Sequence, residues 1–352
     1  MLRVTKIILL NLIILILLLV TLEAAYRAVY YFARGPEAVI SPVVSDDKFG
    51  WVHNTNARTS VRNNRCGEEV VRTPSAHELI NRFPATSSGR PILFIGDSTT
   101  HAHEVSSGQA YYDIFENEEG VEFSVYAAGT GGYGNLQEYL VLDAVFDEVN
   151  PDIVVWQLDP NDIRNNVYQL DHSSIYNNQR PRPYLIDGNI QVMNPGFWLF
   201  DWSKGFLFVF RKTLIIDRKF DLGFLNWLNS FRSLEPEDNK MYRTQGLNVL
   251  DVVLRKVAEN YPKTTFIGFS VAAKDDSDFE HVFKKNGLSY FPGFYKYLSE
   301  IEGTDCQPLD GHWNHLGNTV AGKKLRELIE AELRPASSAS IEQNRRTEEA
   351  LK

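Results

Sequence analysis

The stretch PILFIGDSTT, residues 91–100, decides the fold predicted for this chain. Residues 91–95 form an apolar run of the length expected for a short strand that is buried on both faces of a parallel sheet. Gly96 permits a tight turn out of the strand, and Asp97 and Ser98 are typical turn and helix-capping residues. Ser98 is therefore predicted just past the carboxyl end of a central strand, where open α/β sheets place their sites. A strand-to-helix turn without a catalytic role explains the same residues, so the remaining motifs decide between the two.

Further apolar runs extend this unit into a sheet. Strands are predicted at residues 123–128, 152–158 and 264–271, and helices at residues 136–149, 247–259 and 319–333. Alternation of strands and helices is typical of a parallel sheet with helices on both faces. The predicted fold class is therefore α/β, a flavodoxin-like three-layer α/β/α sandwich with a parallel central sheet.

Polar or glycine-rich motifs follow two more of these strands. The turn GTGGYG occupies residues 129–134, and Asn161 follows the strand that ends at Leu158. The glycine-rich turn lacks the G-x-G-x-x-G spacing of a dinucleotide site, and no acidic residue stands at the expected distance, so that reading is rejected. For Asn161 the structural alternative is an ordinary Asx turn. Near the chain end, DGHWN at residues 310–314 adds an aspartate and a histidine.

These four pieces resemble, in order, the four blocks of the SGNH (GDSL-like) hydrolase family. The resemblance covers residues 91–333 apart from an insertion. It implies the SGNH hydrolase fold, with Ser98 as nucleophile and His312 and Asp310 as the other members of a catalytic triad. It also implies an oxyanion hole formed by the backbone N–H groups of Ser98 and Gly132 and the side-chain amide of Asn161, and no cofactor.

The chemistry of these residue types agrees with the resemblance. A serine hydroxyl is a weak nucleophile at neutral pH and needs a neighbouring base, here His312. The imidazole needs a partner that fixes its tautomer, here Asp310. The oxyanion that forms on attack at an ester carbonyl needs fixed hydrogen-bond donors.

Two departures from the family pattern bear on the site. Asp159 stands where the third block has a glycine, and it opposes the developing charge unless it points away or caps a helix. A single residue separates Asp310 from His312, where the family has two, so Asp305 is the fallback partner of the histidine. His315 is the competing base, and the His-x-Asn-x-x-Gly arrangement favours His312.

The N-terminus carries a predicted membrane anchor. Residues 7–22 are apolar except for Asn11 and Thr21, and aromatic residues follow up to Phe32. Sixteen helical residues span roughly 24 Å, slightly less than a hydrocarbon core, so residues 7–32 are predicted to contact the lipid bilayer. A cleaved signal peptide is the alternative, although the apolar region is longer than usual for one. The predicted location is a single-pass membrane protein with its catalytic domain outside the cytoplasm, in the periplasm or at the cell surface.

The predicted organisation has four parts. Residues 1–34 are the anchor, residues 35–88 a stalk and irregular extension, and residues 89–334 the hydrolase domain. This domain contains an insertion at about residues 163–240, with a hairpin at residues 184–192 and an aromatic-rich stretch at residues 197–210. Residues 335–352 are polar and predicted to be disordered.

Composition excludes several other classes. The net charge is −9 without a long basic stripe, so no nucleic-acid partner is expected. His101 and His103 stand beside Glu104, but no third spaced ligand follows, so no metal site is expected. The two cysteines, Cys66 and Cys306, do not form a C-x-x-C pattern, and they are able to pair in an oxidising compartment.

The predicted function is a serine esterase that acts on acyl esters. An extracytoplasmic location makes the O-acyl groups of cell-envelope glycans a natural substrate class. Two alternatives remain at this point. One is an O-acyltransferase, in which a sugar hydroxyl replaces water, and the other is a catalytically silent glycan-binding module.

Overall fold

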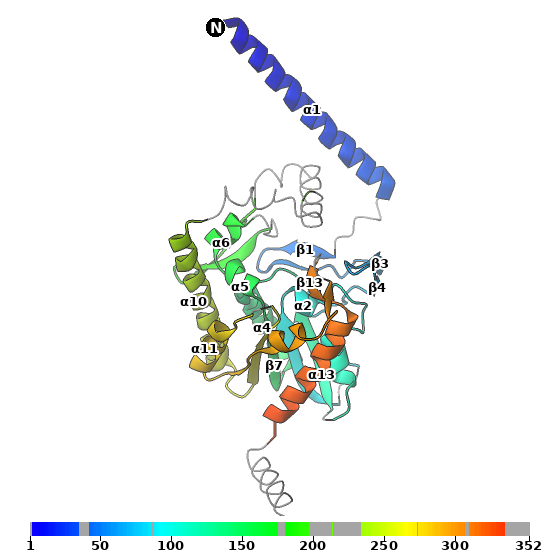
Figure 1. Cartoon of the computed structure of the whole chain (residues 1–352), viewed down its shortest axis with the longest axis vertical. Helices are drawn as coiled ribbons and strands as arrows, with labels where there is room; N and C mark the ends of the chain where they lie inside the picture. Colours follow the sequence, from blue (N-terminus) through cyan, green and yellow to red (C-terminus); the bar gives the residue numbers. More distant parts are fainter. Residues whose placement is uncertain are drawn as a thin grey trace, which may run out of the picture.

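A five-stranded parallel sheet forms the centre of the molecule (Figure 1). The computed structural model describes residues 2–34, 42–85, 88–120, 122–174, 180–196, 213, 234–272, 274–306 and 310–334. The strands are β5 (Arg90–Gly96), β6 (Phe123–Gly129), β7 (Ile153–Leu158), β10 (Thr265–Ser270) and β11 (Ser289–Phe291). Their order across the sheet is β11-β10-β7-β5-β6, and every neighbouring pair is parallel. In chain order this is the doubly wound 2-1-3-4-5 arrangement.

The sheet confirms the four predicted strands and adds a fifth. β11 has only three residues and pairs with β10 from Ile267 to Phe269. A run this short has no measurable periodicity, which is why the sequence analysis missed it. It pairs only because the longer β10 presents an unpaired edge.

Both faces of the sheet are covered, as the apolar runs predicted. All six residues of β7 are buried, and alternate side chains enter different clusters. Val154 and Trp156 pack on one face, and Ile153 and Val155 pack on the other. A strand buried on both faces favours apolar residues at successive positions, and this explains why five of the six residues of β7 are apolar.

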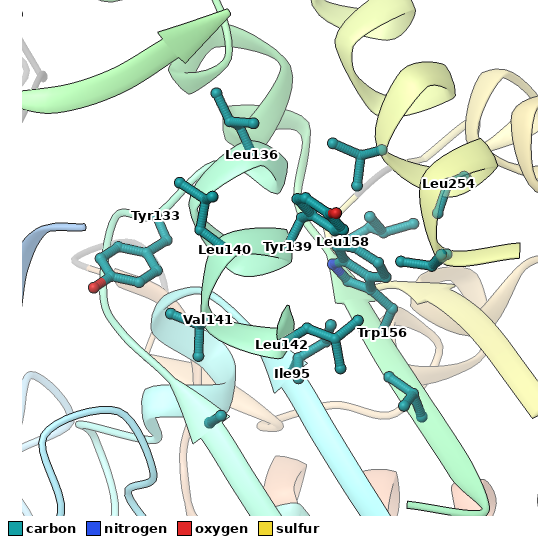
Figure 2. Packing of buried hydrophobic residues seen from close by; sticks show 14 of the residues in the cluster. Ile95, Tyr133, Leu136, Tyr139, Leu140, Val141, Leu142, Trp156, Leu158 and Leu254 are labelled. Atoms are coloured by element: carbon teal, nitrogen blue, oxygen red, sulfur yellow. The ribbon is translucent and has the colours of Figure 1, made fainter. Parts of the chain in front are cut away.

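Helices α4 (Asn135–Val149), α10 (Pro236–Asn260) and α11 (Ser277–Lys285) cover the face that contains Trp156. Figure 2 shows Leu136, Leu140 and Leu142 of α4 together with Trp156 and with Leu254 of α10. Helices α3 (Tyr111–Asn117), α12 (Phe294–Ser299) and α13 (His315–Glu332) cover the other face. In Figure 1, α10 and α13 accordingly lie on opposite sides of the sheet.

Residues 42–85 contain two hairpins that pack on the sheet domain. β1 (Val43–Asp46) pairs with β2 (Gly50–His53), and β3 (Ser60–Asn63) pairs with β4 (Glu69–Arg72). Trp51 and Val52 are buried in the same cluster as α4. The irregular extension expected here thus contains two hairpins that pack on the domain, and apolar residues outside β2, such as Phe49 and Ile80, are buried in the same cluster.

The two cysteines form a disulfide that joins this extension to the end of the chain. Cys66 lies in the turn between β3 and β4, and Cys306 ends β12 (Asp305–Cys306). Their Cα atoms are 4.9 Å apart, and the bond closes a loop with a sequence separation of 240. β12 pairs with β13 (Asp310–Trp313), the strand that carries His312.

Replacing both cysteines by serine is expected to lower the free energy of unfolding by about 2–5 kcal/mol, because the long loop is then open in the unfolded chain. Urea unfolding of the oxidised parent and of the double variant measures this difference. The parent treated with a reductant is the matched control and is expected to coincide with the variant. Equal midpoints for the oxidised parent and the variant would contradict a stabilising role of the bond.

The predicted hairpin within the insertion is present. β8 (Arg182–Ile186) pairs with β9 (Asn189–Met193) through Asp187 and Gly188, which both have positive φ. This is the backbone that a two-residue hairpin turn requires. The next described helix is α10, which begins at Pro236. The aromatic stretch at residues 197–210 lies outside the described residues. The predicted tail at residues 335–352 lies outside them as well.

The N-terminal residues form one long helix, α1 (Leu2–Arg34). Glu23 and Arg27 form the i, i+4 ion pair that their spacing allows, with 2.6 Å between Oε1 and Nε. Across the described parts of the chain, no helix combines the length and the apolarity needed to cross a membrane. The membrane anchor therefore stays a prediction from the sequence.

Candidate active site

The carboxyl ends of β5, β6 and β7 bring three of the predicted site residues to one edge of the sheet. Ser98 begins the short helix α2 (Ser98–His101) directly after β5, and Asp97 caps this helix by accepting a hydrogen bond from the Thr99 N–H. Gly132 lies in the turn between β6 and α4, and Asn161 lies in α5 (Pro160–Asn165), which follows β7. Parallel strands all end at the same edge, so Ser98, Gly132 and Asn161, which are 29 and more residues apart in sequence, meet there.

His312 contacts the Ser98 hydroxyl. Nε2 of the ring lies 2.7 Å from Oγ, although 214 residues separate the two in sequence. This is the hydrogen-bond distance at which an imidazole takes a proton from a hydroxyl nucleophile. The competing histidine, His315, is exposed at the first residue of α13. Of the two predicted bases, the structure places His312 against the serine.

The partner of the histidine is defined only in part. The backbone of Asp310 lies in β13, and its side chain lies outside the described atoms. The fallback residue Asp305 lies opposite Trp313 in the β12–β13 pair. The assignment of Asp310 as the orienting carboxylate stays a prediction.

The two non-serine donors of the predicted oxyanion hole lie beside Ser98. Gly132 has a φ of +82°, a backbone conformation that residues with a side chain rarely adopt. The preceding Gly131 lies close to Ser98, because a Cβ atom added at Gly131 would come within 3.9 Å of the Ser98 Cα and Cβ atoms. The Asn161 amide reaches the same place, because Nδ2 donates to Oδ2 of Asp97 at 3.2 Å. Oγ of Ser98 lies 3.1 Å from that same carboxylate oxygen.

Asn165 holds both of these donors, and the sequence analysis missed it. Its buried Nδ2 donates to Oδ1 of Asn161 at 3.2 Å and to the carbonyl oxygens of Gly132 and Tyr133 at 3.2 and 3.0 Å. A donor on Oδ1 orients the Asn161 amide so that its Nδ2 faces the serine. The only signal in the sequence is the i, i+4 spacing of Asn161 and Asn165 on one helix.

A buried glutamine holds the turn that carries the nucleophile. Oε1 of Gln157, the fifth residue of β7, accepts hydrogen bonds from the Asp97 and Thr100 backbone N–H groups and from the Thr100 hydroxyl. Its Nε2 donates to Oδ1 of Asp97 at 3.1 Å. With every polar atom of the amide paired, the turn is rigid where Ser98 must be placed accurately.

Asp159 caps the helix that carries Asn161. Its Oδ1 accepts a hydrogen bond of 2.8 Å from the Asn161 N–H, so it is the N-cap of α5. Burial, followed by the nearby Asp97 carboxylate, raises its pKa to about 6. The residue that departs from the family pattern therefore serves as a helix cap.

Two further carboxyl groups are buried beneath the oxyanion hole. Oε2 of Glu138 accepts hydrogen bonds from Trp156 Nε1 at 2.7 Å and from Asn135 Nδ2 at 3.1 Å, and the same Asn135 amide also donates to Asp162. Burial raises the pKa of Glu138 to about 8, and burial together with Glu138 raises the pKa of Asp162 well above its usual value. The pair therefore keeps at least one proton at neutral pH.

This proton makes folding stability depend on pH. Because the pKa of Glu138 is higher in the folded chain, the folded state binds more protons between pH 4.5 and about 8, and stability falls as the pH rises through that window. Glu138→Gln keeps the hydrogen-bond acceptor and removes the titration. The variant is therefore expected to gain stability relative to the parent with rising pH, by at most about 1.4 kcal/mol per pH unit.

Chemical unfolding at pH 5, 6, 7 and 8 measures this gain. Glu119→Gln, at an exposed position, is the matched control and is expected to follow the parent at every pH. A constant difference between Glu138→Gln and the parent over the whole range would contradict the raised pKa.

Three histidines lie beside the nucleophile and are neutral. The rings of His101 and His103 stack with centroids 4.3 Å apart, and His53 lies 5.0 Å from His101. Burial lowers the pKa of His53 and His103 to about 4 and that of His101 well below its usual value. Neutral His101 accepts a hydrogen bond through Nδ1 from the Gly131 N–H at 3.2 Å. The cluster thus ties α2 to the glycine-rich turn, and among the described residues no group of His, Cys, Asp and Glu side chains is arranged to hold a metal ion.

The N-terminal hairpins support the helix that carries the serine. Arg72 of β4 donates to the carbonyl oxygens of His101 and Ala102, each at 3.0 Å, and Arg62 of β3 donates to the carbonyl oxygen of His103. Unpaired carbonyl groups at the end of a helix need such donors, and a cation also complements the helix dipole there.

Two cavities have walls that include residues of the site. One of about 220 Å³ is lined by residues that include Trp51, His103 and Gly131. Another of about 510 Å³ is lined by residues that include Asn161, Arg164 and Arg243. A substrate group therefore has space to bind next to Asn161 and next to Gly131, which precedes Gly132.

Comparison with known proteins gives matches to solved structures only; no family model and no curated protein matches this chain. The chain is similar to the structure of TesA at 14% identity and a TM-score of 0.37, over 67% of this chain and 98% of that one. It is similar to the psychrotrophic esterase EstA from Pseudoalteromonas sp. at 11% identity and a TM-score of 0.39, over 69% and 97%. A lipase/acylhydrolase from Enterococcus faecalis matches at 16% identity and a TM-score of 0.37, over 70% and 98%. At these values the matches assign no activity to this chain.

Proposed function

We propose that this chain is a serine hydrolase that cleaves carboxylic esters. The observation that carries the proposal is the 2.7 Å contact between Oγ of Ser98 and Nε2 of His312, at the sheet edge where Gly132 and Asn161 also lie. A hydroxyl that contacts an imidazole beside fixed N–H donors is the arrangement that acyl transfer requires.

In the first half of the proposed reaction, Oγ of Ser98 attacks the ester carbonyl carbon while its proton passes to Nε2 of His312. The carbonyl oxygen becomes an oxyanion that accepts hydrogen bonds from the N–H groups of Ser98 and Gly132 and from Nδ2 of Asn161. The intermediate collapses when the C–O bond to the alcohol breaks, and the alcohol leaves with the proton from His312.

In the second half, water attacks the acyl group on Ser98 and gives its proton to His312. Breakdown of this second intermediate returns the proton to Oγ and releases the carboxylic acid. Asp310 is the proposed carboxylate that orients the His312 ring and stabilises its charged form. No cofactor takes part in these steps.

Covalent labelling tests the proposal directly. The full chain is treated with a fluorophosphonate, which reacts with an activated serine, and the modified peptide is identified by mass spectrometry. One phosphonyl group on Ser98, together with hydrolysis of 4-nitrophenyl acetate above the buffer rate, is the expected result. Ser98→Ala is expected to lose both, whereas Ser299→Ala, at an exposed serine of α12, is expected to keep both.

The same experiment separates the alternatives. A chain labelled on Ser98 that does not turn over the ester in water, but does so when a sugar alcohol is added, is an acyltransferase. A chain that is neither labelled nor active overturns the proposed function and favours a silent binding module.

The setting of the activity is a separate proposal. We infer that residues 7–32 anchor the chain in a membrane with the catalytic domain outside the cytoplasm, where acylated envelope glycans are the substrates. The uninterrupted apolar sequence of residues 12–20 and the presence of a disulfide support this location. Recovery of the full chain from the washed membrane fraction, with its domain accessible to protease from outside the inner membrane, is the expected result. Recovery in the cytosol with reduced cysteines would overturn it.

A further inference from the structure

The larger cavity beside the oxyanion hole is lined by apolar and polar side chains that include two arginines and one acid, Asp159. It has a volume of about 510 Å³, and Asn161 forms part of its wall. Two arginines, Arg164 of α5 and Arg243 of α10, line the same space, and Asn239 and Ser173 add neutral polar groups. The amide proposed to hold the oxyanion is therefore continuous with a space that contains two guanidinium groups.

The guanidinium of Arg164 has donors left over. Its one hydrogen bond within the described residues runs from Nε to Oδ1 of Asn165 at the long distance of 3.5 Å. Burial lowers the pKa of Arg164, because water solvates its charge less well there than in bulk solvent. An arginine nevertheless stays charged at neutral pH, so the Nη groups remain strong donors without an acceptor among the described residues.

Arg243 is the second cation of the wall. It is exposed on α10 and makes no hydrogen bond or ion pair within the described residues. An exposed arginine on a helix usually points to solvent, whereas this one shares a cavity with Arg164. Two like charges that face the same space repel each other, and an anion between them removes that repulsion.

The acids near the cavity offset these charges only in part. Asp171 attracts the Arg164 charge, but it also pairs with Arg182, with 3.0 Å between Oδ2 and Nε and both side chains fully buried. Asp159 lines the cavity, but its Oδ1 caps α5 through the Asn161 N–H. Among the described lining residues, Asp159 is the one carboxyl set against the two guanidinium groups of Arg164 and Arg243.

We propose that the ester substrate of this site carries an anionic group, a carboxylate or a phosphate, which Arg164 and Arg243 bind while the ester carbonyl occupies the oxyanion hole. This inference rests on the proposed ester hydrolysis and specifies its substrate class. Planar guanidinium groups bind both anions through paired N–H donors, so the two share the same recognition chemistry. A neutral sugar ester of the same size leaves both arginines without an acceptor.

Matched pairs of esters test the inference with the full chain. The acyl side is probed with the 4-nitrophenyl monoester of adipic acid against 4-nitrophenyl hexanoate, which has the same chain length without the charge. The alcohol side is probed with 4-acetoxybenzoate against its methyl ester, and 4-acetoxyphenyl phosphate compares phosphate with carboxylate. We expect a higher kcat/KM for the anionic member of at least one pair, and the pair that shows it locates the anion on the acyl or the alcohol half.

Arginine variants connect that preference to the cavity. Arg243→Gln is expected to lower kcat/KM for the preferred anionic ester about tenfold, through KM, and to change the neutral ester by less than about twofold. Arg164→Lys is expected to retain more of the preference than Arg164→Gln. Arg255→Gln is the matched control, since Arg255 is exposed on the same helix and does not line the cavity.

The outcomes separate this inference from the proposed function. The inference is overturned if hydrolysis depends on Ser98 but kcat/KM is equal for charged and neutral esters. It is also overturned if kcat/KM for the anionic ester is equal in Arg243→Gln and the parent. Either result leaves the proposed ester hydrolysis standing. If no ester is cleaved, the proposed function has failed, and calorimetry of Ser98→Ala with adipate and with inorganic phosphate decides whether the cavity binds anions. Binding that Arg243→Gln weakens and Arg255→Gln does not supports the anion site, and no binding overturns it.

Discussion

Ser98→Ala and His312→Gln are each expected to lower kcat for ester cleavage by about four to six orders of magnitude. The hydroxyl and the ring act as one unit across a 2.7 Å contact, so removal of either abolishes the proton transfer that makes the serine nucleophilic. For the same reason, the double variant is expected to be no slower than the worse of the two single variants. Single-turnover and steady-state rates with 4-nitrophenyl acetate measure this non-additivity.

The competing histidine provides the control for this prediction. His315 is exposed three residues further along and is expected to tolerate replacement by glutamine with less than about a twofold change in kcat. A large loss in His315→Gln with an active His312→Gln would overturn the assignment of the base. Circular dichroism of each variant shows that the loss comes from chemistry and not from unfolding.

Asn161→Ala is expected to lower kcat by about 100- to 1,000-fold with little change in KM. Its Nδ2 is the proposed side-chain donor to the oxyanion, and a donor of this kind stabilises the transition state more than the ground state. The substitution leaves Asp159 free to cap α5, because that hydrogen bond comes from the backbone N–H. The loss therefore measures the amide group itself.

Asn165 is expected to act on the same step through Asn161 and Gly132. Asn165→Ala removes the donor to Oδ1 of Asn161 and to the Gly132 carbonyl, so kcat is expected to fall about tenfold or more while KM stays near that of the parent. Asn165→Gln, which keeps the amide, is expected to recover part of kcat. Asn161→Ala combined with Asn165→Ala is expected to be little slower than Asn161→Ala alone. Fully additive losses would show that Asn165 stabilises the fold without positioning the amide.

The positions of four strands and of the nucleophile follow from local sequence. The apolar runs that became β5, β6, β7 and β10 are recognisable because a strand buried on two faces favours apolar residues at most of its positions. The glycine and polar residues after them mark the turns at the carboxyl edge, so Ser98, Gly132 and Asn161 were placeable before any contact was known. The same reasoning missed β11, since three residues that pair with a longer neighbour show no pattern of their own.

The organisation of residues 42–85 was beyond local patterns. Its polar composition predicted an irregular stalk, yet Trp51 is buried on α4, and Arg62 and Arg72 bind the carbonyl groups at the end of α2. These contacts join segments about 30 to 80 residues apart. A polar hairpin is ordered by the residues on which it packs, and those residues cannot be identified from the hairpin's own sequence.

By itself, the sequence determined the strand–turn units, the resemblance that assigned roles to Ser98 and His312, and the pair of cysteines available for a disulfide. Only the tertiary structure decided which histidine reaches the serine, that Asp159 caps a helix, that Asn165 holds two oxyanion donors, and that Arg164 and Arg243 share one cavity. Strand and turn formation depend on neighbours within a few residues, and these are visible in the chain order. The protonation of buried groups, the orientation of the Asn161 amide and the charge of the cavity depend on distances of a few ångströms. These distances join segments up to 214 residues apart, and only folding sets them.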